Sequence, residues 1–440
     1  MSDATTIRGL TPREVLRPAD EGELAAILAK ACAERTACYI GGRLTKQHWG
    51  GAPDRMDLLI ETGALSGCYD VDPDNLTLTA GPGTTVAEAR AQAEAVGRVL
   101  PLDPEQPGRA TIGGVVATGD QGPRGASYGG LRDVVLGVRA MLAHGTAVKF
   151  GGRTMKNVAG YDMTKLFVGS FGVLGIITEV TFQLLPRPDS QALVIVPLPS
   201  LEEGRTSVAR ILGSYLQPLA LEVVSADALP PDHAARTAKL PAGRATAPAT
   251  GGAPIFPGKP LLLAGFGGHR AAVDRSVREV TGPHLGLAAY VLRDEAAEAF
   301  YEHLAAHEPG AAEGQLGLRA SVPISRALDV VAAARDYSAA NSLVLAYRAG
   351  TARGRVDLLF SSGPAGANAG ETDFAACLAH MRSVAAGMGG SLIATGGAGA
   401  LPAGYDAWGD AGAALAIMTR IKERFDPQRI LNPGRFVGGI

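Results

Sequence analysis

The chain has 440 residues, of which 46% are hydrophobic and 19% are charged, and its formal net charge is −2. This balance is typical of a globular protein with a core, and the lack of a basic excess argues against a nucleic-acid partner. The four cysteines are scattered, so neither a disulfide framework nor a zinc or iron–sulfur site is indicated.

The amino terminus has no signal pattern, and no apolar run reaches the roughly eighteen residues that a transmembrane helix needs. We therefore expect a cytoplasmic protein without a transmembrane segment. Peripheral attachment to the inner face of the plasma membrane is the alternative.

Strand and helix signals alternate in the first 188 residues. Asp20 followed by Glu23 is typical of a helix start, and apolar residues from Leu24 to Ala31 then share one helical face. The elements that follow are strands at 36–40, 58–61 and 76–80, a helix at 85–96, a hairpin of 134–141 with 147–150, and a strand at 176–185. Pro186 and Pro188 end this region and mark the first domain boundary.

From residue 189 to 400 the pattern changes to β-α-β-β-α-β, and this order occurs twice. The strands are at 192–198, 219–225, 261–266 and 287–292, then at 316–322, 343–348, 355–361 and 391–395. Two ferredoxin-like units in tandem are therefore predicted as a cap domain in an α+β protein. An Ala-, Pro- and Gly-rich insert, 230–260, is expected to be a flexible surface loop. The segment 401–440, with a helix at about 413–424, is expected to return to the first domain.

Three glycine-containing turns in the first domain have the composition expected of a binding site for an anionic cofactor. They are Gly41-Gly42, Ile112-Gly113-Gly114 and Gly172–Gly175. Glycine leaves backbone N–H groups accessible to a ligand, but none of these turns is a Rossmann or P-loop motif. A dinucleotide contacted by all three turns is the interpretation that we adopt.

The order of these turns resembles the FAD domain of the vanillyl-alcohol-oxidase superfamily, which has a PCMH-type fold. The likeness is carried by Gly81-Pro-Gly-Thr-Thr-Val86, Ala110–Ala117, Gly169–Val180, and the C-terminal Phe425-Asp-Pro427 and Leu431-Asn-Pro-Gly434. Within the superfamily, Phe150–Asp162 and Gly122-Pro-Arg124 are most similar to the FAD-binding E subunits of bacterial glycolate oxidase. The likeness covers most of residues 15–190 and the last thirty.

The resemblance implies non-covalent FAD and a set of cofactor-binding residues. Backbone N–H groups of Gly41, Gly42, Arg43, Leu44 and Thr45 would meet the pyrophosphate, although relatives usually have a third glycine and a Thr-Ser pair in this loop. His48 lies downstream of the position at which some members attach the flavin. The rest of the implied set is Pro101, Thr111, Ile112, Gly113, Gly114, Ala117, Thr118, Gly122, Arg124 (for a phosphate), Gly160, Gly175, Ile176, Ile177 and Asn432.

Catalytic residues are harder to find. The metal-binding His-x-Gly-Asp-Gly-Asn-x-His and Glu-His-Gly motifs of many D-2-hydroxy-acid dehydrogenases are missing, and the matching stretch Gly389–Gly397 holds no histidine or carboxylate. His303 and His307 have a ligand spacing, but a solvated helix face is the better reading, so no metal is expected. Arg348 and Arg435 are weak candidates for binding a substrate carboxylate.

The resemblance therefore implies an FAD-binding subunit of a glycolate-oxidase-like complex that oxidises a small 2-hydroxy acid. Its partners would be a second, catalytic FAD subunit and an iron–sulfur subunit, and its own role would be electron transfer or assembly. Two alternatives stay open: a self-sufficient FAD-dependent dehydrogenase or oxidase, and a non-catalytic scaffold of the same fold.

Overall fold

The structure is a computed structural model that describes residues 6–154, 160–228, 258–282, 287, 289–305, 314–363, 373–397, 400–402 and 404–440. The chain divides into two compact units. The first contains residues 1–122, 129–187 and 402–440, and the second contains residues 123–128 and 188–401. A six-residue piece of the glycine-rich region, which includes α4 (Gly125–Tyr128), thus belongs to the second unit.

The first unit begins with a small parallel sheet. Its strand order is β1 (Glu14–Leu16), β3 (Leu58–Glu61), β2 (Cys38–Gly41). Helix α1 (Glu21–Glu34) starts as predicted, because the Asp20 carboxylate accepts a hydrogen bond from the Glu23 N–H at 2.8 Å. The short 3-10 turn η1 (Thr62–Ala64) follows β3 directly.

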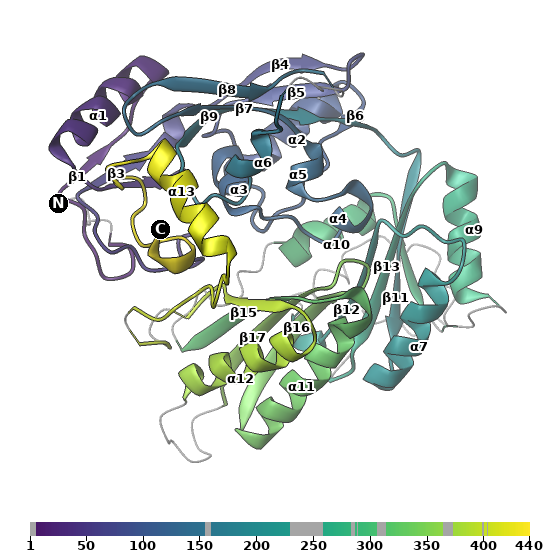
Figure 1. Ribbon diagram of the computed structural model, residues 1–440. Helices are drawn as coiled ribbons and strands as arrows, with labels where there is room; N and C mark the ends of the chain where they lie inside the picture. Colours follow the sequence, from purple (N-terminus) through teal and green to yellow (C-terminus); the bar gives the residue numbers. More distant parts are fainter. Residues whose placement is uncertain are drawn as a thin grey trace, which may run out of the picture. The chain divides into compact units, whose positions relative to one another are not determined.

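A five-stranded antiparallel sheet forms the larger part of the first unit (Figure 1). Its strand order is β4 (Cys68–Asp72), β5 (Thr77–Ala80), β9 (Ile176–Gln183), β7 (Val135–Met141), β8 (Ala147–Gly151). Helices α2 (Val86–Ala95), α3 (Ile112–Thr118), α5 (Leu131–Val134) and α6 (Thr164–Phe167) pack against it. The remaining pieces are β6 (Arg98–Val99), β10 (Leu185–Pro186), α13 (Ala414–Phe425) and η4 (Val437–Gly439).

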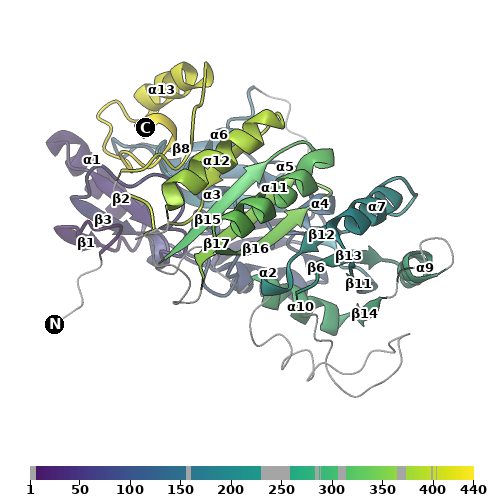
Figure 2. The ribbon, with the colours of Figure 1, turned by 90° about the horizontal axis from the view of Figure 1, so that it is seen from below.

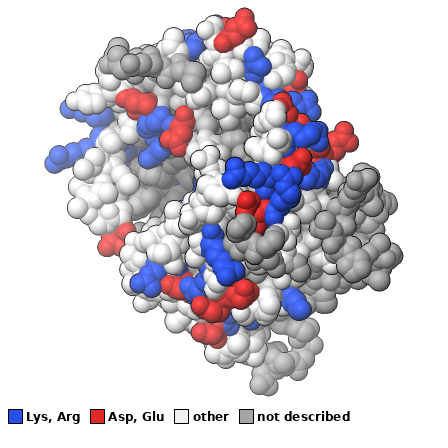
Figure 3. Space-filling view, turned by 90° about the vertical axis from the view of Figure 1, so that its right-hand side faces the viewer, with Lys and Arg blue, Asp and Glu red and all other residues white. Residues whose placement is uncertain are grey.

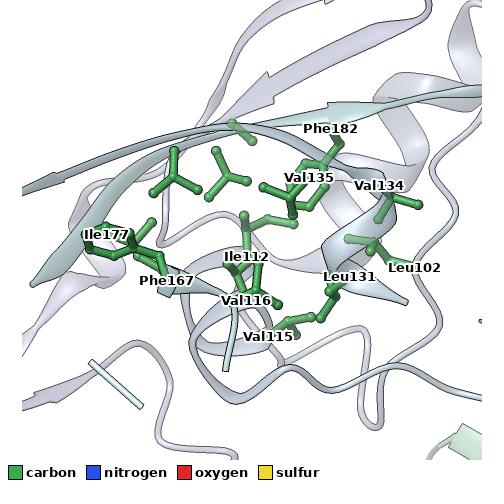
Figure 4. Packing of buried hydrophobic residues seen from close by; sticks show 14 of the residues in the cluster. Leu102, Ile112, Val115, Val116, Leu131, Val134, Val135, Phe167, Ile177 and Phe182 are labelled. Carbon is green, nitrogen blue, oxygen red and sulfur yellow. The ribbon is translucent and has the colours of Figure 1, made fainter. Parts of the chain in front are cut away.

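The core of the first unit lies between this sheet and its helices. Ile112, Val115 and Val116 of α3 belong to the same buried cluster as Phe182 and Ile177 of β9, and Figure 4 shows Ile112 on the side of α3 that faces the sheet and Val115 beside Leu131. All six are at most 5% exposed. Because burial of each such side chain contributes about 1.5–3 kcal/mol, this packing fixes the position of α3 beneath the sheet.

The second unit is an eight-stranded antiparallel sheet built from the two predicted β-α-β-β-α-β halves. Its order is β14 (Tyr290–Arg293), β11 (Ser190–Pro197), β13 (Leu261–Gly268), β12 (Ala220–Val224), β16 (Leu343–Gly350), β17 (Arg355–Ser362), β15 (Gln315–Ser321), β18 (Ser391–Ala394). Each half has the ferredoxin-like order, and the halves join where β12 pairs with β16. The predicted tandem is therefore present.

Helices cover the two faces of the large sheet unequally. In Figure 2, α11 (Ala327–Ala340) and α12 (Phe374–Gly387) lie over strands of the second half, and α7 (Leu201–Leu212) and α9 (Arg270–Thr281) belong to the first half. An additional helix, α10 (Glu295–Ala305), packs Phe300 and Leu304 against the opposite face. The described part of the unit also contains the short turns η2 (Ala226–Ala228) and η3 (Ile324–Arg326).

Several expectations from the sequence fall partly outside the described ranges. Of the insert 230–260 the structure describes only 258–260, and His307 also lies outside. None of the helices within the described ranges combines the length and apolar character needed to cross a bilayer. On the face shown in Figure 3, acidic and basic side chains lie side by side in several places, as the near-zero net charge predicts.

Candidate functional site

One pocket of the first unit brings together the three glycine-containing turns and the C-terminal segment. Its empty space, counted with the open mouth, is about 660 Å³. The residues expected at the cofactor that line it are Gly41, Gly42, Arg43, Leu44, Thr45, Thr111, Gly113, Gly114, Ala117, Thr118, Gly175, Ile176, Ile177 and Asn432. Turns that are far apart in the sequence therefore meet around a single cavity.

The loop after β2 forms one wall of this pocket. Leu44 has a left-handed φ of 56°, a conformation that is costly for any residue with a Cβ. A Cβ on Gly42 would overlap Thr111 Oγ1, so this glycine is needed for the close approach of the loop to α3.

Unpaired backbone donors distinguish this loop from the start of α3. Within the described ranges, the N–H groups of Gly42 to Thr45 donate to no acceptor. At α3 the corresponding donors are engaged: Ile112 donates to Thr84 O at 2.8 Å and Gly113 to Pro82 O at 2.9 Å. The loop 42–45 thus has the backbone donors that an anion-binding site needs.

The C-terminal segment closes the pocket on another side. Leu431 bridges Cys38 of β2, and the Asn432 side chain links two walls: its Oδ1 accepts from Ile40 N–H at 2.9 Å and its Nδ2 donates to Phe171 O at 2.6 Å. A Cβ on Gly172 would lie only 2.8 Å from Asn432 Nδ2. The end of the chain therefore fixes the spacing between the loop after β2 and the 171–175 turn.

Two buried cations line the pocket. Lys46 is 5% exposed, and its Nζ lies 3.0 Å from Asp120 Oδ2 and 3.6 Å from Glu105 Oε2. Arg435 is 4% exposed and has neutral partners, among them the Trp49 carbonyl oxygen at 2.8 Å. In contrast, none of the described residues that line the pocket is His, Asp, Glu, Cys or Tyr.

Some of the expected cofactor residues do not line the pocket. Ile112 is buried in the core, Gly160 is exposed, and Pro101 accepts a hydrogen bond from Gln121 Nε2 at 2.9 Å. The Gly122 N–H donates to Asp103 Oδ1 at 2.9 Å. These positions support neighbouring segments, and the family motif alone did not separate them from the lining residues.

Arg124 has a different partner from the phosphate expected for it. It lies in the segment that belongs to the second unit, where its Nη1 is 2.7 Å from Glu298 Oε2 and its guanidinium lies over the Tyr301 ring at 5.2 Å. An arginine that is already paired with a carboxylate and stacked on an aromatic ring is poorly available to bind a cofactor phosphate. The ion pair instead joins residues 123–128 to α10 within the second unit.

Replacing Arg124 with glutamine is therefore expected to change the dissociation constant of FAD less than twofold, about 0.4 kcal/mol. The same change should lower the free energy of unfolding by about 1–3 kcal/mol, because Glu298 loses its partner. FAD titration and urea denaturation of the same samples measure both quantities. If Arg124→Gln instead caused a large loss of FAD affinity and no change in the free energy of unfolding, Arg124 would bind an FAD phosphate as the family resemblance implies.

Several residues line the pocket although the sequence did not predict this role for them. They are Ile40, Lys46, Gln47, Thr62, Pro82, Phe171 and Gly172. Gly172 lay within a turn that was recognised, and Pro82 lay in the Gly-Pro-Gly motif. Lys46 and Gln47 had no such signal, because polar residues in a loop are usually exposed.

Arg348 lies in a charged cluster on the large sheet of the second unit. The cluster is formed by Arg319, Arg348, Arg355, Asp357 and Glu222, and all five side chains are at most 16% exposed. Although burial raises the pKa of Asp357, the charges of Arg319, Arg355 and Arg348 hold it well below its ordinary value. No group of three or more His, Cys, Asp or Glu side chains arranged for a metal occurs in the described ranges.

Two family models match the chain. The FAD binding domain matches residues 12–151, and the C-terminal domain of FAD linked oxidases matches residues 187–436. In fold, the chain is similar to alkyldihydroxyacetonephosphate synthase, with a TM-score of 0.67 over 95% of this chain and 76% of that protein at 17% identity.

Curated relatives match at moderate identity. The glycolate oxidase subunit GlcE of Escherichia coli is 38% identical over 191 residues, which are 43% of this chain and 53% of that protein. The glycolate oxidase subunit GlcD of Bacillus subtilis is 32% identical over 220 residues, 50% of this chain and 47% of that protein. A D-lactate dehydrogenase of Archaeoglobus fulgidus is 32% identical over 208 residues, which are 47% of this chain and 46% of that protein. The matches span about half the length of these relatives.

Proposed function

This chain belongs to the FAD-linked oxidase family, and we propose that it is the FAD-binding subunit of a complex that oxidises a small 2-hydroxy acid such as glycolate. A second, catalytic flavin subunit would oxidise the substrate. An iron–sulfur subunit would take part in electron transfer. Similarity to the E. coli glycolate oxidase subunit GlcE supports the subunit role.

FAD is the cofactor of this family, and the pocket residues fit its charge and its need for close backbone approach. The free N–H groups of Gly42 to Thr45 would hold the pyrophosphate, with Gly42 allowing the loop to lie against Thr111. Asn432 would keep the two walls at a fixed spacing. When bound, the flavin supplies a centre that accepts and passes on electrons.

The observation that carries the proposed role is the lack of proton-transfer groups among the described residues that line the pocket. Oxidation of a hydroxy acid requires a base for the hydroxyl proton. Among the described residues that line the pocket, the only ionisable side chains are Arg43, Lys46 and Arg435. All three are cations and suit an anion-binding and electron-transfer role better than proton abstraction.

Co-purification of the native complex, followed by identification of subunits and cofactors by mass spectrometry, tests this proposal. We expect FAD, a second flavin subunit and an iron–sulfur subunit in stoichiometric amounts. The isolated chain should bind FAD but should not reduce a dye when glycolate or D-lactate is added. Turnover by the isolated chain would contradict the subunit role.

A self-sufficient dehydrogenase is the second candidate, and the charged cluster of the second unit favours it. Arg348 Nε lies 4.0 Å from Glu222 Oε2, a loose pair, and three arginines face two carboxylates there. Arg348, with its loose ion pair, would suit a substrate carboxylate. Under this alternative, substrate should bleach the flavin of the isolated chain, and Arg348→Gln should abolish the bleaching.

A further inference from the structure

Arg435 is a buried cation whose partners in the described part of the chain are all neutral. Its Nη1 donates to Tyr39 Oη and Gln47 Oε1, and its Nη2 donates to the carbonyl oxygens of Lys46 and Trp49 at 3.5 and 2.8 Å. The guanidinium also lies 4.9 Å from the centre of the Tyr39 ring. Its Nε has no acceptor, and no carboxylate of the described residues lies within 4 Å of it.

An uncompensated buried charge is unfavourable, because burial removes the water that would otherwise stabilise it. Burial, with a smaller effect from the charge of Arg8, lowers the pKa of Arg435 to about 9. Lys46 in the same wall has carboxylate partners in Asp120 and Glu105. Arg435 is thus the buried cation of this pocket whose counter-charge the described residues do not supply.

The position of Arg435 relates this charge to the loop with the free backbone donors. The guanidinium donates to the carbonyl oxygens of Lys46 and Trp49, and thereby holds the segment that follows loop 42–45. The N–H groups of Gly42 to Thr45 belong to the preceding part of the same loop, and both Arg435 and these residues line the pocket. A single anion placed in the pocket would satisfy the donors and balance the arginine.

We infer that Arg435 is the buried counter-charge for the diphosphate of FAD, and that it also fixes the loop that contacts this diphosphate. This role was not part of the set expected from the family motif, in which Arg435 was a candidate for a substrate carboxylate. The inference concerns the cofactor pocket only. It does not depend on which hydroxy acid the complex oxidises or on which partners it has.

The test compares ADP, which carries the diphosphate, with adenosine, which lacks it, on the full chain freed of FAD. Arg435→Gln is expected to weaken ADP binding about tenfold, since a hydrogen bond or contact to a charged group is lost, and to leave adenosine binding unchanged. Arg435→Lys should retain most of the ADP affinity. Arg13→Gln, whose side chain is 85% exposed, is the matched control and should alter neither.

Equal losses for ADP and adenosine would show that Arg435 only supports the loop, and would overturn the inference. If the Arg435→Gln variant does not fold, the inference is tested by the salt dependence of ligand binding to the wild-type chain. Its ADP affinity should fall as salt rises from 0.05 to about 0.5 M while adenosine affinity stays constant, since salt screens only the charged ligand. An ADP affinity that is insensitive to salt would contradict the proposal. Because no turnover is measured, the result is independent of the proposed subunit role.

Discussion

Replacing Lys422 with methionine is expected to lower the free energy of unfolding by about 3–5 kcal/mol, the usual cost of removing one partner from a buried ion pair. Lys422 is 1% exposed, and its Nζ donates to Asp426 Oδ2 at 2.7 Å, Val173 O at 2.9 Å and Leu431 O at 3.0 Å. Burial lowers the pKa of Lys422 despite the attraction of Asp426. The pair itself therefore adds little, but a methionine would leave the fully buried Asp426 carboxylate without its cation.

Urea denaturation followed by circular dichroism measures this loss. Glu423→Gln is the matched control on the same helix, because its ion pair with Arg429 is more than half exposed and contributes at most about 0.5 kcal/mol. FAD should also bind more weakly to Lys422→Met, since Leu431 and Val173 adjoin the pocket residues Asn432 and Gly172. A destabilisation below about 1 kcal/mol would mean that Asp426 is stabilised by its N–H donors alone.

Local signals in the sequence predicted the elements whose stability is local. The Asp20 cap located α1, and the double β-α-β-β-α-β pattern predicted the large sheet of the second unit, because hydrophobic periodicity is set within each element. The three glycine-containing turns were also recognised in the sequence, and they line one pocket; at Gly42 glycine is needed because a Cβ there would overlap Thr111. The family resemblance and the FAD domain are confirmed by the matching family models.

Elements that depend on distant contacts were not predicted. Helix α3 has seven residues, two of them glycine, and shows no helical periodicity. It is held by Thr84 and Pro82, which accept its first N–H groups, and by burial of Val115 and Val116. The pairing of Arg124 with Glu298, 174 positions later, likewise had no signal in the sequence. A family motif identifies such an arginine but does not identify its partner.

Gly42→Ala is expected to weaken FAD binding about 10- to 100-fold, because overpacking of a close contact costs about 1–3 kcal/mol. The new Cβ would overlap Thr111 Oγ1 and lie 3.1 Å from Thr111 Cβ. Thr111 has little freedom to move, since it is the N-cap of α3 and bridges Thr85. The loop would therefore shift, and its free N–H groups would leave the positions from which they converge on the pocket.

The steric origin of this effect is tested by removing the group with which the alanine collides. Thr111→Ala combined with Gly42→Ala should bind FAD more tightly than Gly42→Ala alone, whereas Thr111→Ala in the wild-type background should bind FAD slightly more weakly through loss of the helix cap. Gly108→Ala is the control, because an added Cβ there meets no atom within 4 Å. If the double variant were as weak as the sum of the two single variants, the loss at Gly42 would have to come from the backbone conformation rather than from the contact with Thr111.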